Sequence, residues 1–294
     1  MLKSIDRIVI VTDQIEQAQR DCVALLGRSP SWSGEYPGRA IRYVLFCVEN
    51  TRIELISPIG SVSENSELRN HLDAKGPGLF GLVFSTMDIN ESLESIQKLG
   101  ITCGDPLSVL AHDEPSGAYR RLVQSGLSKK DTRGVRLSVS SSSTADELLP
   151  PALPLGEVSA TVTKVDHVVI STRDADRAKT LYGDSLGIRL ALDRSFPERG
   201  LRLLFFKLGG VTLEFSVPTR DDAELGSTHE NEDNLWGLAY QVPNADHAQA
   251  RLKESGFDVS DVRKGHKPGT RVFTIKSSPL GIPTLMIEPV ESVS

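Results

Sequence analysis

The chain has 294 residues, a hydrophobic content of 39% and a formal net charge of −6. Its length can supply two ordinary domains with full cores, and the negative charge without a Lys/Arg-rich stripe argues against nucleic acid as a partner. No apolar run approaches about 18 residues and the N-terminus lacks a leader-like core, so we expect a cytoplasmic protein that does not span a membrane. Three widely spaced cysteines, Cys22, Cys47 and Cys103, exclude a disulfide framework and a thiolate zinc site.

Four segments, taken in chain order, share one plan: a β-branched strand, a cap, an amphipathic helix, a glycine and further strands. They open as IDRIVIVTDQIEQAQRDCVALLG, FGLVFSTMDINESLESIQKLG, VDHVVISTRDADRAKTLYGDSLG and WGLAYQVPNADHAQARLKESG. Gly100, Gly187 and Gly256 stand where a helix C-terminus favours a left-handed residue. The sequence therefore predicts an α+β fold built from four βαβββ units.

A serine-rich and then proline-rich stretch, SVSSSSTADELLPPALPLGEVSATVT, separates the second unit from the third. It lacks a sustained apolar period and is typical of a linker. We expect an N-terminal domain over 1–140, a linker over 141–162 and a C-terminal domain over 163–294.

The repeated unit resembles that of the vicinal oxygen chelate superfamily, which includes glyoxalase I, methylmalonyl-CoA epimerase, extradiol dioxygenases and bleomycin-binding proteins. The resemblance covers almost the whole chain and is strongest at VDHVVISTRDADRAKTLYGDSLGI. It implies that paired units form cupped, half-open barrels, two in this chain. It also implies a divalent metal ion in a cup, held by side chains of the first and last strands of the paired units.

Carried onto this sequence, the resemblance places metal ligands at His167 in the first strand of the third unit and Glu214 in its last strand. The fourth unit has Gly237 at the first-strand position. Its last strand, GIPTLMIEPV, offers Glu288, which reaches the cup only if the preceding turn is lengthened. Alignment on the shared Thr-Leu puts Met286 at the ligand position instead, and counting back from the trailing proline puts Leu285 there.

An imidazole nitrogen and a carboxylate oxygen suit Fe, Mn, Co, Ni or Zn, with water, substrate or a loop histidine, His229 or His266, completing the coordination sphere. An isolated buried histidine is more often a hydrogen-bonded core residue, whereas an unpaired buried carboxylate costs several kcal/mol. A metal-free acid/base pair of His167 and Glu214 is the alternative interpretation.

Substrate contacts are expected from two places in the C-terminal half. Trp236 and Tyr240 could line the mouth of the cup, with core packing as the alternative. His266 and Arg271, in the turn GHKPGTR, could meet an anionic group, with a solvated hairpin as the alternative.

The N-terminal half departs further from the ligand pattern. Glu54 is kept, but Arg7, Gly81 and Ser138 stand at the other three positions. Arginine carries only donors and stays protonated, so it cannot bind a cation. We expect an Arg7–Glu54 ion pair and a degenerate metal site.

The resemblance implies a divalent-metal-dependent lyase or isomerase of the glyoxalase or epimerase type, acting on a small oxygenated molecule through an enolate-like intermediate. His167 and Glu214 are the expected catalytic residues, Glu214 as ligand and base. One alternative is a metal-free binding or sequestering protein. Another is a ring-cleaving extradiol dioxygenase. Gly237 argues against this alternative, because it occupies the position of the second histidine ligand in those enzymes. The sequence leaves open whether the cups form within one chain or across a homodimer.

Overall fold

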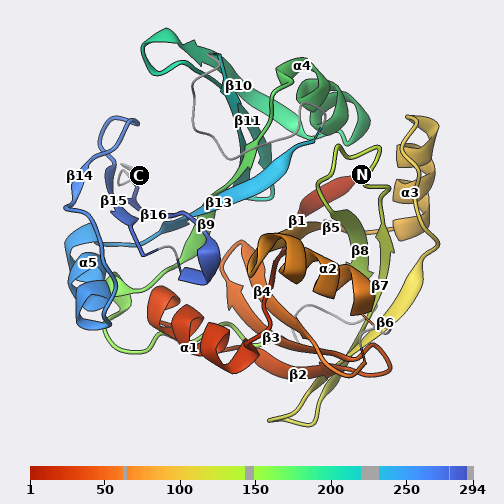
Figure 1. The fold of residues 1–294 in the computed structure, drawn as a ribbon, viewed down its shortest axis with the longest axis horizontal. Helices are drawn as coiled ribbons and strands as arrows, with labels where there is room; N and C mark the ends of the chain where they lie inside the picture. Colours follow the sequence, from red (N-terminus) through yellow and green to blue (C-terminus); the bar gives the residue numbers. More distant parts are fainter. Residues whose placement is uncertain (62–64, 143–148, 220–231, 278, 290–294) are drawn as a thin grey trace.

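The computed structural model describes the chain except residues 62–64, 143–148, 220–231, 278 and 290–294 (Figure 1). The first half contains these elements: β1 (Leu2–Val11), α1 (Ile15–Leu26), β2 (Trp32–Tyr36), β3 (Ile41–Val48), β4 (Thr51–Pro58), α2 (Ser66–Lys75), β5 (Gly78–Thr86), α3 (Ile89–Lys98), β6 (Leu107–Asp113), β7 (Tyr119–Gly126) and β8 (Leu137–Ser142). Within the part of the chain so described, no helix is long and apolar enough to cross a membrane.

The second half begins after a short 3₁₀ turn at Val158–Ala160. Its strands and helices are β9 (Lys164–Ser171), α4 (Ala175–Ala178), β10 (Arg189–Phe196), β11 (Leu201–Leu208), β12 (Val211–Pro218), β13 (Asn234–Gln241), α5 (Ala245–Glu254), β14 (Arg263–Lys264), β15 (Arg271–Ile275) and β16 (Thr284–Glu288). A π-helical segment, Lys179–Ser185, continues α4, and 3₁₀ turns lie at Pro197–Arg199 and Pro279–Gly281.

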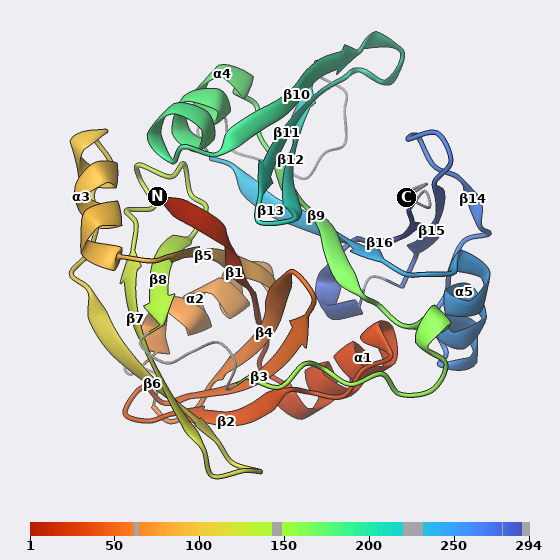
Figure 2. The same cartoon turned by 180° about the vertical axis from the view of Figure 1, so that it is seen from behind.

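Each half forms one eight-stranded sheet, and the strand order confirms the four predicted units. The orders are β1-β4-β3-β2-β6-β7-β8-β5 and β10-β11-β12-β9-β13-β16-β15-β14. In every unit the first strand pairs in parallel with the last, and the first strands of paired units run antiparallel. The first sheet closes into a barrel because β2 pairs with β6, whereas the second stays open with β10 and β14 at its edges (Figure 2).

The unit helices begin and end as the sequence pattern predicts. Asp88 and Asp174 accept hydrogen bonds from backbone N–H groups in the first turns of α3 and α4. The three glycines that follow the helices have left-handed φ angles: 88° at Gly100, 67° at Gly187 and 87° at Gly256.

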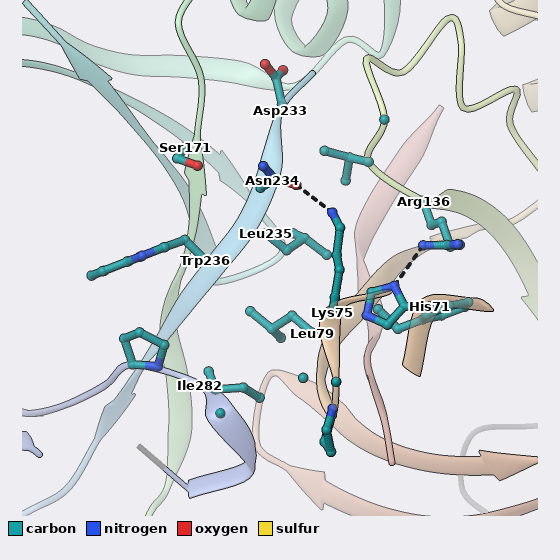
Figure 3. A pocket seen from close by; sticks show the side chains of 18 residues that line it. His71, Lys75, Leu79, Arg136, Ser171, Asp233, Asn234, Leu235, Trp236 and Ile282 are labelled. Carbon is teal, nitrogen blue, oxygen red and sulfur yellow. Dashed lines mark hydrogen bonds between the residues drawn. The ribbon is translucent and has the colours of Figure 1, made fainter. Parts of the chain in front are cut away.

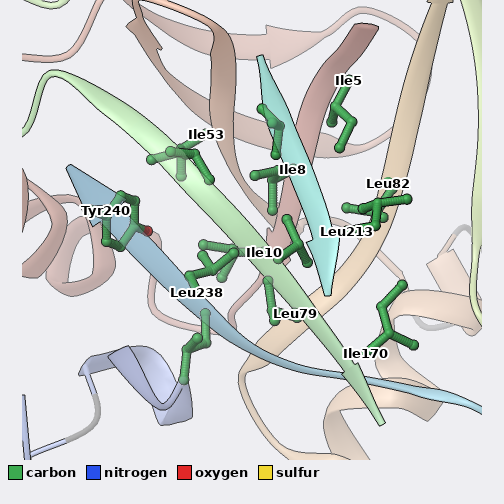
Figure 4. Close-up of a cluster of buried hydrophobic side chains, with 14 of the residues drawn as sticks. Ile5, Ile8, Ile10, Ile53, Leu79, Leu82, Ile170, Leu213, Leu238 and Tyr240 are labelled. Atoms are coloured by element: carbon green, nitrogen blue, oxygen red, sulfur yellow. The ribbon is translucent and has the colours of Figure 1, made fainter. Parts of the chain in front are cut away.

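The two halves share one continuous hydrophobic core (Figure 4). Ile8 and Ile10 of β1 pack with Leu213 of β12 and Leu238 of β13, and all four side chains are buried. These residues lie on the faces of the two sheets that point away from the cups. The shared core therefore fixes the strands that line both cups.

Polar side chains fasten the same interface. Arg251 of α5 donates hydrogen bonds to the carbonyl oxygens of Ala24 and Leu25 at the C-terminus of α1. Buried Arg133 and Asp233, one from each half, form an ion pair with an Nε–Oδ1 distance of 3.2 Å. The chain between β8 and β9 packs as well, since Ala160 and Val162 are buried. The domain limits drawn from the sequence stay a prediction.

Candidate functional site

An irregular step in β9 places two neighbouring side chains on the cup face of the second sheet. His167 is opposite Ala239 of β13, but Val165 is opposite Tyr240, so a register shift lies at Asp166. A bulge of this kind lets two consecutive residues point to one side of a strand. Asp166 and His167 therefore both face the cup, where regular alternation would have separated them.

Asp166 fixes the orientation of the His167 ring. The Nδ1 atom of His167 lies 2.8 Å from Asp166 Oδ1, and Gln241 Nε2 donates to Asp166 Oδ2 at 2.6 Å. An ionised carboxylate can only accept, so Nδ1 carries the proton. This leaves Nε2 unprotonated in the neutral ring and directed at Glu214, whose Oε2 atom is 3.5 Å away. The structure thus brings His167 and Glu214 together as the sequence predicts.

The environment shifts the pKa values of the three groups differently. Burial favours neutral His167, but the hydrogen bond with Asp166 and the charges of Glu214 and Asp166 outweigh it and raise the pKa. Burial raises the pKa of Glu214, with His167 opposing it only in part. Burial also acts to raise the pKa of Asp166, yet hydrogen bonds from His167 and Gln241 hold it below its usual value. Asp166 is therefore the anchor and Glu214 the readier proton acceptor.

The two ligand positions of the fourth unit carry no side chain that could bind a metal ion. In the third unit, Val169 of β9 is paired with Glu214 on one side and with Gly237 on the other. In the fourth unit, Ala239 of β13 is paired in the same way with Leu285 on one side and with His167 on the other. Leu285, the residue obtained by counting back from the proline, therefore occupies the position equivalent to Glu214. Met286, the alternative, is fully buried among core residues.

The expectation that Glu288 reaches the cup is not met. Glu288 lies three residues beyond Leu285, and alternation along a strand turns it to the opposite face. Its Oε2 atom accepts a hydrogen bond of 2.7 Å from the backbone N–H of Ala245 at the start of α5, and Arg271 donates to it at 3.3 Å. Glu288 caps a helix and takes no part in the cup.

A close backbone contact explains the glycine at the second first-strand position. A Cβ atom on Gly237 would lie 2.9 Å from the carbonyl oxygen of Pro283, and one on Gly81 in the first half would lie 2.8 Å from that of Arg136. Each carbonyl accepts the N–H of the next residue, Leu238 or Leu82. The hydrogen bond that joins the neighbouring segment to the strand thus leaves no space for a histidine.

The predicted substrate-binding residues are scattered. Tyr240 is fully buried in the shared core, and Arg271 is held outside the cup by Asp246 at 2.7 Å. Trp236 is 39% exposed and lines a cavity between the halves. His266 is exposed on the β14–β15 hairpin, where its Nδ1 atom lies 2.8 Å from Arg199 Nη2.

Two loop histidines, His229 and His266, are candidates for completing the coordination sphere of a metal ion. His229 lies outside the described residues. Lys267, next to His266, is close enough to Asp166 to help lower the pKa of that carboxyl group. The β14–β15 hairpin thus brings positive charge to the rim of the cup.

The N-terminal cup is filled by its own side chains. Arg7 Nε donates to Glu54 Oε2 at 3.1 Å, which confirms the expected ion pair, and Nη1 donates to Asp6 at 2.8 Å. Arg7 Nη2 also donates to Gln124 at 2.6 Å, and the Tyr36 hydroxyl donates to Glu54. A cluster of buried apolar residues takes up the remaining space: Val9, Val11, Trp32, Tyr43, Leu45, Ile56, Leu68, Val83, Ala111 and Leu149.

The second cup fits a cation in part. Atoms about 2.0–2.2 Å from a common ion can lie 3.5 Å apart, as His167 Nε2 and Glu214 Oε2 do. The Asp166 contact at Nδ1 is the arrangement that commonly orients a metal-binding histidine. Among the described residues no cluster of three or more His, Cys, Asp or Glu side chains could hold a metal. Two protein ligands are therefore available from this part of the chain.

Sequence reasoning missed Asp166 and Gln241 as partners of the site. A signal was present, because an aspartate precedes the ligand position in both first strands, as Asp6–Arg7 and Asp166–His167. The first half has the same register shift at that point, between Ile5 and Arg7. Read as part of a regular strand, either aspartate would be expected on the face opposite to the cup.

Comparison with known proteins establishes the family. A profile of the Glyoxalase/Bleomycin resistance protein/Dioxygenase superfamily matches residues 6–113 and 166–274. The chain belongs to this superfamily, and each half contains one matched region.

Three similar proteins illustrate the range of relatives. The ethylmalonyl-CoA/methylmalonyl-CoA epimerase of Cereibacter sphaeroides is 24% identical over 100 residues, covering 33% of this chain and 75% of the epimerase. The human mitochondrial methylmalonyl-CoA epimerase is 27% identical over 106 residues, covering 34% and 60%. A variant of 4-hydroxymandelate synthase from Streptomyces coelicolor has a TM-score of 0.66 at 13% identity over 100% of this chain and 95% of its own, which shows the shared fold.

Replacing Gly237 with alanine should lower the free energy of unfolding by about 1–3 kcal/mol, because the added methyl group collides with the Pro283 carbonyl. Urea denaturation measures the change. Gly126→Ala is the matched control, since a Cβ there meets nothing within 4 Å. Equal stability of the two variants would contradict the close approach.

Asp166→Asn should lower the pKa of His167, because it removes the carboxylate that stabilises the imidazolium. A raised pKa in the folded state stabilises fully below the unfolded value of about 6.5, and the gain is lost as pH rises through the folded pKa. The loss of stability in the variant should therefore be greater at pH 5 than at pH 9. NMR titration of His167, with surface Asp184→Asn as control, tests this; an unchanged pKa would contradict it.

Proposed function

We propose that the C-terminal cup is the active site of a divalent-metal-dependent isomerase or lyase that moves a proton on a small oxygenated substrate. The observation that carries the proposal is the opposition of His167 Nε2 and Glu214 Oε2 at 3.5 Å, with Nδ1 of the same ring held by Asp166. Both side chains are largely buried but open to the cup, at 14% and 20% exposure. An ion pair with a purely structural role would need only the contact between Nε2 and Glu214, and not the second contact that orients the ring through Nδ1.

His167 and Glu214 are the residues that would hold the cation. A bound divalent ion would stabilise negative charge that develops on neighbouring substrate oxygens. Asp166 keeps the lone pair of Nε2 directed into the cup. Glu214 projects into the same cup, where its carboxylate is also placed to take a proton from a carbon next to a carbonyl group and to return it.

The two sides of the cup suit different parts of a substrate. The third unit contributes the polar pair, and the fourth unit contributes an apolar patch of Ala239, Val272 and Ile287 with Leu285 packed against it. Lys267 adds positive charge near Asp166. An acyl compound with a small apolar branch and an anionic group matches this division, and the named epimerase relatives make methylmalonyl-CoA the first substrate to test.

Gly237 weighs against ring-cleaving dioxygenase chemistry. That chemistry uses two histidines and one carboxylate on iron. The Pro283 carbonyl occupies the space that a second histidine at position 237 would need.

Mn, Fe, Co, Ni or Zn should raise the melting temperature of the wild-type protein, because an ion that binds the folded state stabilises it by mass action. His167→Ala and Glu214→Gln should lose this effect. His247→Ala removes an exposed histidine elsewhere and should keep it. An equal response of wild type and His167→Ala, or no response to any of the five metals, would contradict the metal site and favour a metal-free binding protein.

With methylmalonyl-CoA in deuterated water, the metal-loaded protein should exchange the proton at the branched carbon. Glu214→Gln should slow this exchange by at least about 10²–10⁴-fold, because the change removes the proposed base and, with it, one of the two side chains that would hold the ion. Mass spectrometry follows the label, and Glu94→Gln on the surface of α3 is the matched control. Equal rates in the Glu214 and Glu94 variants, or no exchange by wild type, would contradict the proposal for this substrate.

A further inference from the structure

A cavity of about 480 Å³ lies between the two halves, and neither His167 and Glu214 nor Arg7 and Glu54 line it. This volume is within the range of small-molecule sites, about 300–1,000 Å³. The first half contributes the end of α2, the start of β5 and the segment before β8. The second half contributes the end of β9, the start of β13 and the turn before β16. The cavity therefore exists only where the halves are joined.

One side of the cavity carries two cations with spare donor capacity (Figure 3). Lys75 Nζ donates to Asn234 Oδ1 at 2.9 Å, and the described residues give it no carboxylate partner. Arg136 donates from Nε to Glu67 at 2.7 Å, and its Nη1 atom lies 3.2 Å from Nδ1 of His71. Nη2 of Arg136 has no partner within the described ranges. An ammonium group and a guanidinium edge are thus available together.

Two acids near the cavity, Asp233 and Glu67, cancel little of this positive charge. Asp233 is engaged by buried Arg133, which comes from the first half. Glu67 pairs with Arg136 but is 63% exposed, so solvent screens that contact. His71 remains neutral at pH 7, because burial and the charges of Arg136 and Lys75 lower its pKa to about 4. Among the described residues that line the cavity, Lys75 and Arg136 outnumber Asp233, so this part of the wall carries a surplus of positive charge.

The rest of the wall is apolar and aromatic. Leu79, Leu235, Ile282 and Pro283 line it, and Trp236 lies opposite the basic side in Figure 3. The Arg136 guanidinium stacks over the Phe80 ring at 4.1 Å from its centroid, which holds the cation in place.

An unused hydroxyl group marks the second half's side of the cavity. Ser171 lines the cavity and is 2% exposed, and its Oγ atom has no hydrogen-bond partner among the residues that the structure describes. Buried hydroxyl groups are normally satisfied. The Oγ atom itself exposes less than 1 Å² of surface, so the hydroxyl group is not counted among the groups that would contact a ligand.

We propose that this interdomain cavity binds a small organic carboxylate with an apolar body. The carboxylate accepts hydrogen bonds from Lys75 Nζ and Arg136 Nη2, and the apolar part lies against Trp236 and Ile282. The site is separate from the His167–Glu214 cup, so it can exist whether or not that cup is catalytic.

Phenylacetate is the probe, and isothermal titration calorimetry on the full chain is the measurement. Phenylacetamide keeps the shape without the charge, and acetate keeps the charge without the ring; both should bind at least about tenfold more weakly. Lys75→Met and Arg136→Gln should each weaken phenylacetate binding by about tenfold or more, as expected for the loss of a charge-assisted hydrogen bond. Lys75 is exposed at the end of α2, so its replacement leaves the fold intact.

Two control variants show whether phenylacetate binds in this cavity and not elsewhere on the protein. Lys98→Met removes an equal charge from the surface of α3 and should bind phenylacetate like the wild type. His167→Ala should also bind it normally, which distinguishes this cavity from the cup. Undetectable phenylacetate binding, equal binding of the amide, wild-type affinity in Lys75→Met, or loss of binding in His167→Ala would overturn the proposal.

Discussion

The register shift in the first strand of the second sheet is the constraint on which the candidate site depends. It puts an aspartate and a histidine on one face of β9, so that Asp166 can bind Nδ1 of His167 and leave Nε2 directed at Glu214. Without the shift, Asp166 would point toward the α4 side of the sheet and the ring would lose its anchor. Bulges recur next to functional sites for this reason, because they redirect a side chain without changing the rest of the ladder.

The same backbone arrangement serves a different purpose in the first half. There the corresponding pair is Asp6 and Arg7, and the guanidinium group of Arg7 supplies the positive charge that pairs with Glu54. The barrel closes through β2 and β6, and apolar side chains fill its interior. The second sheet stays open and keeps its polar pair accessible. The two halves share one topology but differ in their cups: the first is filled and structural, and the second is the candidate reactive site.

The sequence predicts the repeat and the positions on the well-anchored strands, because strand, cap, helix and glycine recur in order. It places Arg7, Glu54, His167 and Glu214 in the cups, where the strand pairings bring each pair together. It does not determine the register of β16, since Thr-Leu and the trailing proline give different alignments across the turn before that strand. Pairing of β16 with β13 places Leu285 at the ligand position. Glu288 then lies at the N-terminus of α5, where it accepts a backbone hydrogen bond. The bulge at Asp166 and the cavity between the halves depend on tertiary contacts and carry no local periodicity.

His167 and Glu214 face each other across the open cup, and we propose that they share one ion. Anomalous diffraction from crystals soaked in Mn²⁺ tests this most directly, because it locates the ion without reference to activity. We expect a single strong anomalous peak in the C-terminal cup, within bonding distance of His167 Nε2 and Glu214 Oε2. A cup with no peak, with the two side chains in direct hydrogen-bonded contact, would contradict it.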